Sequence, residues 1–322
     1  MRQNPIHRLL SRQSAIIIDG GLATEIEARQ HRLDTSLWSA QLLLEDPGVL
    51  RCVHADYLGA GADIIIAATY QATIEGFTGQ VSREQAQRLL TDAVNLAHGA
   101  RQSFWQREEK RPGRQRPLVA ASIGPYGAYL ADGSEYLGEY GLTEADLFDF
   151  HRERFHLLAQ SPADLLACET IPSRLEAHAL IRLLAELNDC WAWLTFTCRD
   201  GQHMADGTPL AEIATVADGA PQVAAVGVNC VSPDIVLEAV RTLRLATSKP
   251  IVVYPNSGET WNAAEKCWIP GSFRAGLSNS AKLWFEAGAR LLGGCCRIGP
   301  LEIQFLREAL LGTSSSSSQR AS

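Results

Sequence analysis

The chain has 322 residues, of which 46% are hydrophobic and 20% are charged, and its formal net charge is -7 at pH 7. This composition is typical of a globular protein and excludes a disordered or collagen-like chain. The acidic balance excludes the basic surface that phosphate-backbone binding requires, so we expect no nucleic-acid partner. The length allows one large domain or two ordinary ones.

No apolar run approaches the roughly 20 residues that span a bilayer, and residues 1–13 lack the apolar region of a secretion signal. We therefore expect a cytoplasmic protein that has no membrane partner. Its 8 cysteines are too sparse for a disulfide scaffold, and a reducing compartment keeps them as thiols. Clustered cysteines therefore need another explanation.

Short runs rich in isoleucine, valine and leucine alternate with segments of helical spacing along the whole chain. Eight runs are expected to form strands, namely 15–19, 63–69, 117–123, 163–168, 191–196, 222–228, 250–254 and 289–292. Helices are expected over 47–59, 82–107, 173–187, 210–217 and 276–287, and from 143, 232 and 300. At the start of one of them, Ser173 and Glu176 have the spacing of a capping box.

This alternation favours a single α/β domain, a (β/α)8 TIM barrel, over a two-domain doubly wound protein, because no linker divides the chain. The barrel is expected over residues 14–311, after an N-terminal extension of residues 1–13. Residues 312–322 are rich in serine and are predicted to be a disordered tail. A loop with Trp261 and Trp268 is expected before the last strand. The sequence makes no prediction of the oligomeric state.

Functional residues of such a barrel gather at the carboxyl ends of the strands. Cys230 ends the sixth expected strand, and Cys295 and Cys296 follow the eighth. Adjacent strand residues point to opposite faces, but Gly293 and Gly294 supply irregular backbone just before the pair. Because even strands contribute side chains to the same layers of a barrel, the three thiols are expected to come close together.

Three thiolates without a fourth protein ligand describe a zinc site with one open position, as in catalytic zinc. Alternatively, Cys295 and Cys296 are buried small hydrophobes or an oxidisable pair, and the residues alone leave both readings open. No P-loop, dinucleotide-binding glycine motif or nucleophile elbow is present. Nucleotide-phosphate and serine-hydrolase chemistry therefore lack sequence support.

Two acids, Asp19 and Glu169, lie at the mouths of the first and fourth expected strands. Each is a candidate general base, salt-bridge partner or clamp for a substrate ammonium, although a structural role is the default for a single acid. Gly20 and Gly21 leave backbone N–H groups open beside Asp19, which suits a carboxylate. These residues are a candidate amino-acid-binding corner.

Three segments, Asp19-Gly-Gly, Gly227-Val-Asn-Cys230 and Gly293-Gly-Cys-Cys296, resemble the signatures of the zinc-dependent homocysteine S-methyltransferase family. The resemblance covers roughly residues 14–310. Within the family, the chain is most similar to the branch that uses S-methylmethionine, through the stretches 122–136, 167–172 and 254–259.

The resemblance implies that Cys230, Cys295 and Cys296 hold one zinc ion, with the sulfur of homocysteine in the fourth position. By the same match, Asp19 and Glu169 bind the substrate ammonium. The list of substrate-binding residues is completed by Gly20 and Gly21, whose backbone lies near the substrate carboxylate, by Asn229 of the second signature, and by Trp38 and Tyr70.

Trp38 matches an aromatic residue that lines the methyl-donor pocket in the betaine-using branch. Trp38 and Tyr70 are candidates to face a sulfonium through cation–π contact, and core packing is the alternative for each. The tyrosine that follows the strand-four glutamate in the betaine branch is Thr170 here, which argues against betaine.

The implied activity is methyl transfer from S-methylmethionine, with S-adenosylmethionine as a second donor, to L-homocysteine, which gives L-methionine. Selenohomocysteine or selenocysteine are alternative acceptors. From another class, a barrel without activity could use the thiols for redox switching or zinc storage. A cobalamin-dependent methionine synthase is excluded for this chain acting alone, because the barrel fills its 322 residues.

Overall fold

The computed structural model describes residues 3–31, 33, 37–107, 109, 113–262, 267–269 and 276–312. Within them, eight parallel strands form one sheet. They are β1 (Ile16–Ile17), β2 (Ile64–Ala67), β3 (Leu118–Ile123), β4 (Leu165–Ile171), β5 (Ala192–Phe196), β6 (Val223–Asn229), β7 (Ile251–Tyr254) and β10 (Ala289–Leu292). Each coincides with one of the expected strands, and the differences are confined to the strand ends.

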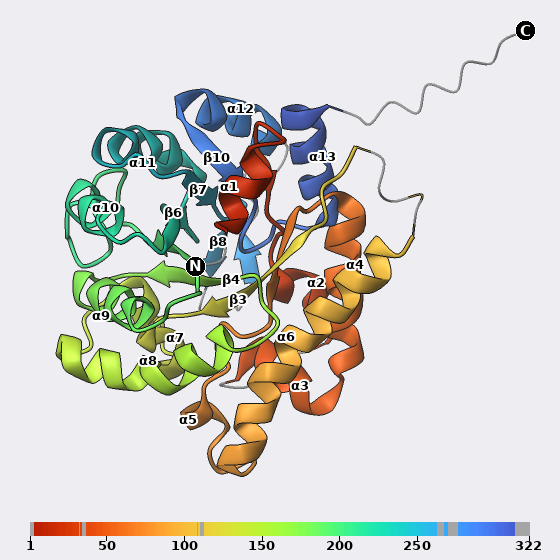
Figure 1. The fold of residues 1–322 in the computed structure, drawn as a ribbon, viewed down its shortest axis with the longest axis vertical. Coiled ribbons are helices and arrows are strands. Elements are labelled where there is room, and N and C mark those ends of the chain that lie inside the picture. Colours follow the sequence, from red (N-terminus) through yellow and green to blue (C-terminus); the bar gives the residue numbers. More distant parts are fainter. Residues whose placement is uncertain are drawn as a thin grey trace, which may run out of the picture.

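The strands follow one another around the sheet in the order β1-β10-β7-β6-β5-β4-β3-β2. Ile18, just after β1, forms a parallel bridge to Ile64 of β2. The Asp63 N–H donates to the Ile17 carbonyl at 2.7 Å across the same gap. The sheet therefore closes into a barrel with helices around it (Figure 1), and the expected (β/α)8 fold is confirmed.

Most helices pack outside the strands, and several short ones lie in the loops at the strand ends. They are α2 (Leu22–Ala28), η1 (Trp38–Gln41), α3 (Leu42–Glu45), α4 (Pro47–Ala60), α5 (Ile74–Phe77), α6 (Arg83–Trp105), α7 (Tyr126–Leu130), η3 (Ser134–Tyr136), α8 (Glu144–Ala159), α9 (Arg174–Ala185), α10 (Leu210–Asp218), α11 (Pro233–Ala246), α12 (Leu277–Ala287) and α13 (Pro300–Leu311). Ser82 and Thr143 cap α6 and α8 with complete capping boxes, so local side-chain bonds decide where these helices begin.

The start of α9 departs from the expected capping box. The Ser173 hydroxyl accepts a hydrogen bond from the Glu176 N–H at 3.4 Å, as expected. The Glu176 carboxylate, however, accepts hydrogen bonds from the Tyr126 N–H at 2.6 Å and from His151 Nε2 at 2.7 Å. Because Glu176 is fully buried, these tertiary partners replace the local one.

A further helix, α1 (Pro5–Leu10), lies within the segment expected as an N-terminal extension. Its buried Ile6 and Leu9 belong to the same apolar cluster as Ile16, Trp193 and other residues from inside the barrel. In Figure 1 the helix lies in front of the strands. The helix therefore covers the amino-terminal end of the barrel, away from the strand ends that carry the cysteines.

The two-residue period of the strands divides the core into an inner and an outer layer. In β3, Leu118 and Ala120 face the barrel interior, whereas Val119 and Ala121 pack against the surrounding helices. The same alternation continues around the sheet. Polar side chains at the inward positions near the carboxyl ends of the strands therefore meet at that end of the barrel.

The segment expected as a loop with Trp261 and Trp268 contains a two-stranded antiparallel ribbon. It consists of β8 (Thr260–Asn262) and β9 (Cys267–Ile269), in which Trp261 pairs with Trp268. The loop prediction is therefore wrong for these residues. The expected tail lies outside the described residues from position 313 onward.

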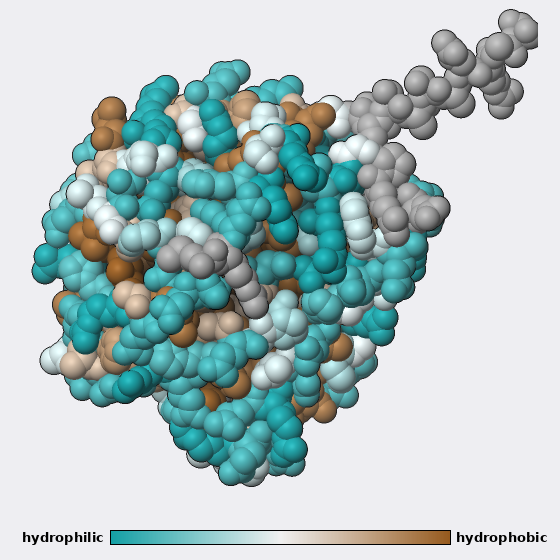
Figure 2. Space-filling view, viewed as in Figure 1, coloured by the Kyte–Doolittle hydropathy of each residue, from teal (hydrophilic) through white to brown (hydrophobic). Residues whose placement is uncertain are grey.

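The surface in the view of Figure 2 is mostly hydrophilic, with smaller apolar areas between the polar residues. Among the described residues, no helix is both long and apolar enough to cross a membrane.

Candidate active site

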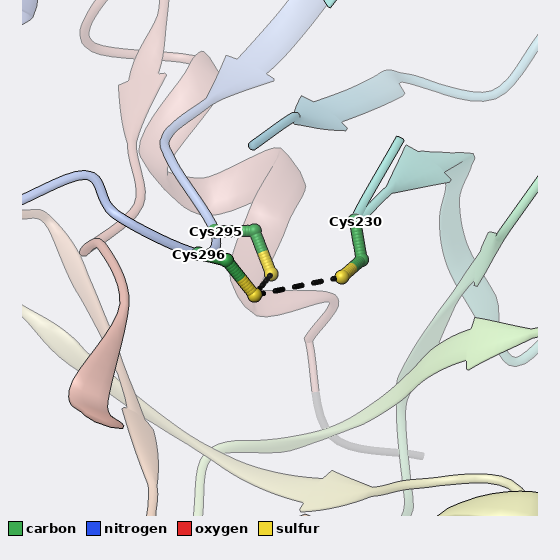
Figure 3. Close-up of side chains that lie close together, drawn as sticks. All are labelled: Cys230, Cys295 and Cys296. Carbon is green, nitrogen blue, oxygen red and sulfur yellow. Dashed lines mark hydrogen bonds between the residues drawn. The ribbon is translucent and has the colours of Figure 1, made fainter. Parts of the chain in front are cut away.

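Three cysteine side chains converge at the carboxyl end of the barrel, as expected from their places in the sequence. Cys230 follows β6, and Cys295 and Cys296 lie on the turn after β10 (Figure 3). Sγ of Cys296 lies 3.8 Å from Sγ of Cys230 and 4.0 Å from Sγ of Cys295. Tetrahedral zinc with bonds of about 2.3 Å to sulfur requires sulfurs about 3.8 Å apart. The thiols are therefore spaced for such a metal.

The backbone near these thiols has conformations that few residues adopt. Cys230 has a φ of +52°, in the left-handed region. A Cβ on Gly293 would lie 2.7 Å from Cβ of Ile18, and one on Gly294 would lie 2.2 Å from Cγ2 of Ile298. The two glycines therefore allow the turn that carries the cysteine pair to pack against β1 and its own continuation.

The loop after β7 joins the two segments that carry the cysteines. The Cys295 N–H donates to the Pro255 carbonyl at 2.8 Å, and the Cys296 N–H donates to Oδ1 of Asn256 at 3.2 Å. The N–H of Asn256 in turn donates to the Val231 carbonyl at 3.0 Å. Asn256 therefore helps to fix the distance between Cys230 and the cysteine pair, a role that the sequence analysis did not assign.

Hydrogen bonds among the three thiols shift their pKa values in opposite directions. Hydrogen bonds from Cys295 and Cys296 lower the pKa of Cys230 well below its usual value. The same interactions with Cys230 raise the pKa of Cys295 and of Cys296 well above theirs. Ionisation of all three thiols would therefore be favoured by a cation among them, and a soft divalent metal would supply that charge.

Tyr136 of η3 is a residue that the sequence analysis missed as a contact of this cluster. Its hydroxyl lies 3.2 Å from Sγ of Cys230, although the two residues are 94 positions apart in the chain. No local pattern could have identified this contact, because it depends on how the long loop after β3 folds over the barrel. The loop therefore brings a hydrogen-bonding group to the edge of the thiol cluster.

Glu169 of β4 points into the barrel beside the thiols and is 7% exposed. One carboxylate oxygen accepts a hydrogen bond from the Ser122 hydroxyl, and the other accepts one from the Tyr254 hydroxyl at 3.0 Å. Burial raises the pKa of Glu169 to about 7, although both hydrogen bonds oppose the shift. The carboxyl group is therefore held in place and changes its charge near neutral pH.

Tyr254 is itself oriented by two further side chains. Nε1 of Trp193 donates to its hydroxyl oxygen at 3.2 Å, and the Thr195 hydroxyl lies 2.8 Å away. The sequence could have indicated that Trp193 and Thr195 point into the barrel, because alternate residues of a strand face the same side. Both then lie on the face of the sheet that carries Glu169 in β4.

Asp19 follows β1 and is almost completely buried. Its Oδ2 accepts a hydrogen bond from the Ile66 N–H at 2.8 Å. Burial raises the pKa of Asp19 well above its usual value, and the charge of Glu169 raises it further. The fold therefore places the two acids at the same end of the barrel, after β1 and near the end of β4, where the charge of one raises the pKa of the other.

The two glycines after Asp19 differ in what their N–H groups contact. The N–H of Gly21 donates to the Ile298 carbonyl at 2.9 Å, so it is already engaged within the protein. Among the described residues, the N–H of Gly20 has no such partner. A Cβ on Gly20 would lie 2.3 Å from the same Ile298 carbonyl, so close backbone packing is a further reason for glycine here.

The other expected binding residues are placed as follows. The side-chain amide of Asn229 is paired with Thr170, with its Oδ1 accepting the Thr170 N–H at 2.7 Å. Tyr70 lies against Gly124, where a Cβ would come within 2.8 Å of its ring. Burial raises the pKa of Tyr70 well above its usual value, and the charge of Cys230 raises it further. Trp38 begins η1, and its side chain lies outside the described part of the structure.

A buried network of charged side chains anchors the start of the loop after β3. Nη2 of Arg154 donates to the Gly124 carbonyl at 2.6 Å and to Nδ1 of His151 at 3.0 Å. His151 then donates through Nε2 to Glu176, which also receives the Tyr126 N–H. Burial lowers the pKa of His151, which favours the neutral ring that this donor and acceptor pattern requires.

Comparison with known proteins relates this arrangement to one family. The family model for homocysteine S-methyltransferase matches residues 16–310. Homocysteine S-methyltransferase YbgG of Bacillus subtilis is 47% identical over 302 residues, which cover 94% of this chain and 96% of the relative. Selenocysteine Se-methyltransferase of Brassica oleracea var. italica is 44% identical, with 94% and 92% covered.

The fold is also similar to that of a solved structure. The metallated form of the homocysteine methyltransferase MmuM from Escherichia coli matches with a TM-score of 0.85 and 43% sequence identity. The match covers 94% of this chain and 99% of the MmuM chain.

Proposed function

The chain belongs to the homocysteine S-methyltransferase family, and from this premise we propose that it transfers a methyl group from S-methylmethionine to L-homocysteine, forming L-methionine. The observation that carries the proposal is the convergence of Cys230, Cys295 and Cys296, with two Sγ–Sγ distances of 3.8 and 4.0 Å. This cluster supports a metal-dependent thiol chemistry rather than a hydrolytic or nucleotide-dependent one.

We assign zinc as the metal, because three thiols in a compact group suit its tetrahedral geometry and leave one position for a ligand. Zinc bound there would keep a coordinated thiol ionised as a thiolate at neutral pH. Reduced thiols are required to hold the metal, so we propose that the protein acts in the cytoplasm.

Asp19 and Glu169 would bind the α-ammonium group of homocysteine. Both carboxyl groups are buried beside the thiols, and their pKa values are raised by burial, so an incoming cation would restore their ionised forms. Ser122 and Tyr254 hold the Glu169 carboxylate in place. The N–H of Gly20 is the backbone donor left for the substrate carboxylate, because the N–H of Gly21 is bound to Ile298.

A sulfonium donor fits the charges of the site better than a neutral one. Three cysteine sulfurs, together with the carboxyl groups of Asp19 and Glu169, surround the reaction centre with negative charge when ionised. Tyr70 is a candidate to face the sulfonium through its ring, a contact worth about 0.5–2 kcal/mol; we assign Trp38 to the same wall from the family resemblance. S-adenosylmethionine is the second candidate donor on the same grounds.

The transfer itself is a displacement in which the acceptor sulfur attacks the methyl carbon. A carbon–sulfur bond forms to homocysteine while the bond to the donor sulfonium breaks, and its electron pair stays on the donor sulfur. With S-methylmethionine both products are methionine, and the proton of the homocysteine thiol is released to solvent. The residues of the chain contribute chiefly positioning, which can lower a barrier by up to about 7–11 kcal/mol in the best cases.

Methionine formation from homocysteine by reduced, zinc-loaded protein tests the proposal. S-methylmethionine, S-adenosylmethionine and betaine are compared as donors, each with a chelator control. Chelator-sensitive methionine formation with a sulfonium donor and none with betaine is the expected result. Zinc-containing protein that forms no methionine from any of the three would contradict the proposal.

The acceptor is the part of the proposal that a relative brings into question. A protein named selenocysteine Se-methyltransferase is 44% identical to this chain. A selenol is ionised at lower pH than a thiol and would bind the same metal position. Competition between homocysteine and selenocysteine, each at equal concentration with the same donor, ranks the two acceptors, and preference for selenocysteine would replace homocysteine in the proposal.

A further inference from the structure

One carboxylate oxygen of Glu135, Oε2, is buried near the candidate active site without a hydrogen-bond partner among the described residues. Glu135 lies in η3, directly before Tyr136, the residue whose hydroxyl contacts Cys230. Burying a polar atom without a hydrogen bond costs free energy, so the position indicates a ligand that this oxygen would bind.

The position of Glu135 is set by the packing of the loop. A Cβ on Gly127 of α7 would lie 2.3 Å from the Glu135 nitrogen, so the two segments are in close contact. The turn into η3 is made by Gly133, which has a φ of +90°. Burial raises the pKa of Glu135, its own backbone N–H lowers it, and the charge of nearby Cys230 raises it further. Glu135 belongs to the short helix that reaches the edge of the thiol cluster through Tyr136.

Among the described residues, no salt bridge joins Glu135 to a cationic side chain. Arg297, which follows the cysteine pair, forms an ion pair with Glu259 at 2.7 Å. Asp19 and Glu169 are assigned above to the ammonium group of homocysteine. Glu135 is thus a third acid near the thiols, and a second cationic ligand is what its surroundings lack.

We propose, on the basis of the proposed function, that Glu135 is the anionic contact for the sulfonium group of the methyl donor. The methyl carbon must face an acceptor sulfur held at the thiol cluster. The sulfonium is therefore the part of the donor that lies nearest Cys230, and the amino-acid end lies farther away. A carboxylate on the helical turn that contacts Cys230 would consequently meet the sulfonium rather than the α-ammonium group.

This contact acts on donor binding more than on the chemical step. The sulfonium carries its full charge when the donor binds and loses it as the methyl group leaves, so the attraction is strongest before transfer. Removing it should raise the KM for the donor and leave kcat unchanged or somewhat higher, because the bound donor loses more stabilisation than the transition state does. The attraction is absent once a neutral thioether has formed, which favours product release.

Calorimetric titration of zinc-loaded protein with S-methylmethionine, without homocysteine, measures this binding independently of turnover. For Glu135→Gln we expect a dissociation constant about tenfold higher, the size of one charged contact. Glu139→Gln, which removes an exposed charge from the same loop, is the matched control and should bind as the wild type does. Glu135→Asp keeps the charge and should retain part of the affinity, which provides a second test should the glutamine variant fold poorly.

Homoleucine, in which a CH group replaces the sulfonium of S-methylmethionine, identifies the end of the donor that Glu135 contacts. Its affinity should be the same for the wild type and Glu135→Gln. An equal loss of affinity for homoleucine would place Glu135 at the amino-acid end and overturn the proposal. Unchanged affinity of Glu135→Gln for S-methylmethionine would also overturn it.

The two proposals fail separately in this design. If the wild type binds S-methylmethionine more tightly than Glu135→Gln does but forms no methionine, the sulfonium contact is supported and the methyltransferase function is refuted. If the wild type forms methionine and Glu135→Gln is equally active at low donor concentration, the methyltransferase function is supported and the sulfonium contact is refuted.

Discussion

Asn229 and Thr170 are joined by two hydrogen bonds across the carboxyl end of the barrel. Oδ1 of Asn229 accepts the Thr170 N–H at 2.7 Å, and Nδ2 of Asn229 donates to the Thr170 hydroxyl at 2.8 Å. Asn229 directly precedes Cys230, and Thr170 directly follows Glu169. Thr170 and Cys230 both have positive φ angles, of 61° and 52°. The pair therefore links the strand end that carries a thiol to the one that carries the buried acid.

Replacing Asn229 with alanine should lower the free energy of unfolding by about 1–3 kcal/mol, because the buried Thr170 N–H loses its acceptor. Urea unfolding of the zinc-loaded protein measures the change. Asn95→Ala, at an exposed position of α6, is the matched control and should change stability little. Equal stability of the two variants would show that the Asn229–Thr170 pair contributes nothing to the fold.

Cys230→Ser should lose the metal, because a serine hydroxyl does not ionise at neutral pH and zinc prefers thiolate sulfur here. We expect metal affinity and methionine formation to fall by about 100-fold or more. Loss of a residue that only hydrogen-bonds to a metal ligand typically costs about 10–100-fold, and loss of a ligand itself should cost more. Metal analysis after dialysis and the methionine assay check this. Cys52→Ser, at an exposed cysteine, should match the wild type. Full zinc content and turnover in Cys230→Ser would refute the ligand assignment.

Glu169→Gln should raise the KM for homocysteine by about tenfold, since one charged contact to the ammonium group is lost. Zinc content should stay at the wild-type level, because Glu169 binds Ser122 and Tyr254 rather than the metal. Ser122→Ala removes only one of these supporting hydrogen bonds and should have a smaller effect. Loss of zinc from Glu169→Gln would mean that this residue acts at the metal and not at the substrate.

The raised pKa of Glu169 also predicts how stability varies with pH. Burial raises this pKa to about 7 in the folded protein, against about 4.3 in an unfolded chain. The folded state therefore binds the proton more tightly, and this contribution is full below about pH 4 and is lost as the pH rises through 7.

Between pH 5 and 8, the free energy of unfolding of the wild type should consequently fall by about 2–3 kcal/mol relative to Glu169→Gln, which cannot ionise at this position. Urea unfolding of both proteins across this range gives the difference. Curves that run parallel with pH would show that Glu169 keeps an ordinary pKa in the folded protein.

Glu176→Ala should destabilise the protein by about 3–5 kcal/mol, because it leaves Arg154 as a buried charge without its acid and removes the acceptor of His151. Glu186→Ala, which breaks the more exposed pair with His156, should cost less than about 1 kcal/mol. Thermal unfolding compares the two variants. A small effect for Glu176→Ala would indicate that water replaces the missing carboxylate.

The residues by themselves determined the fold and the place of the thiols. Alternation of apolar runs with helical segments depends on neighbours in the chain, and so do the capping boxes at Ser82 and Thr143. Because parallel strands of a barrel end on one side, the positions of Cys230, Cys295 and Cys296 after their strands sufficed to bring them together. Local periodicity carried this information.

Contacts between distant loops were decided only by the tertiary structure. The hydroxyl of Tyr136 reaches Cys230, Glu176 turns from its own helix cap to His151, and the N–H of Gly21 is bound by Ile298. None of these follows from spacing, because each depends on strand register, barrel closure and the path of a loop. A buried polar group takes the partner that the assembled fold offers, and that partner is not set by its neighbours in the sequence.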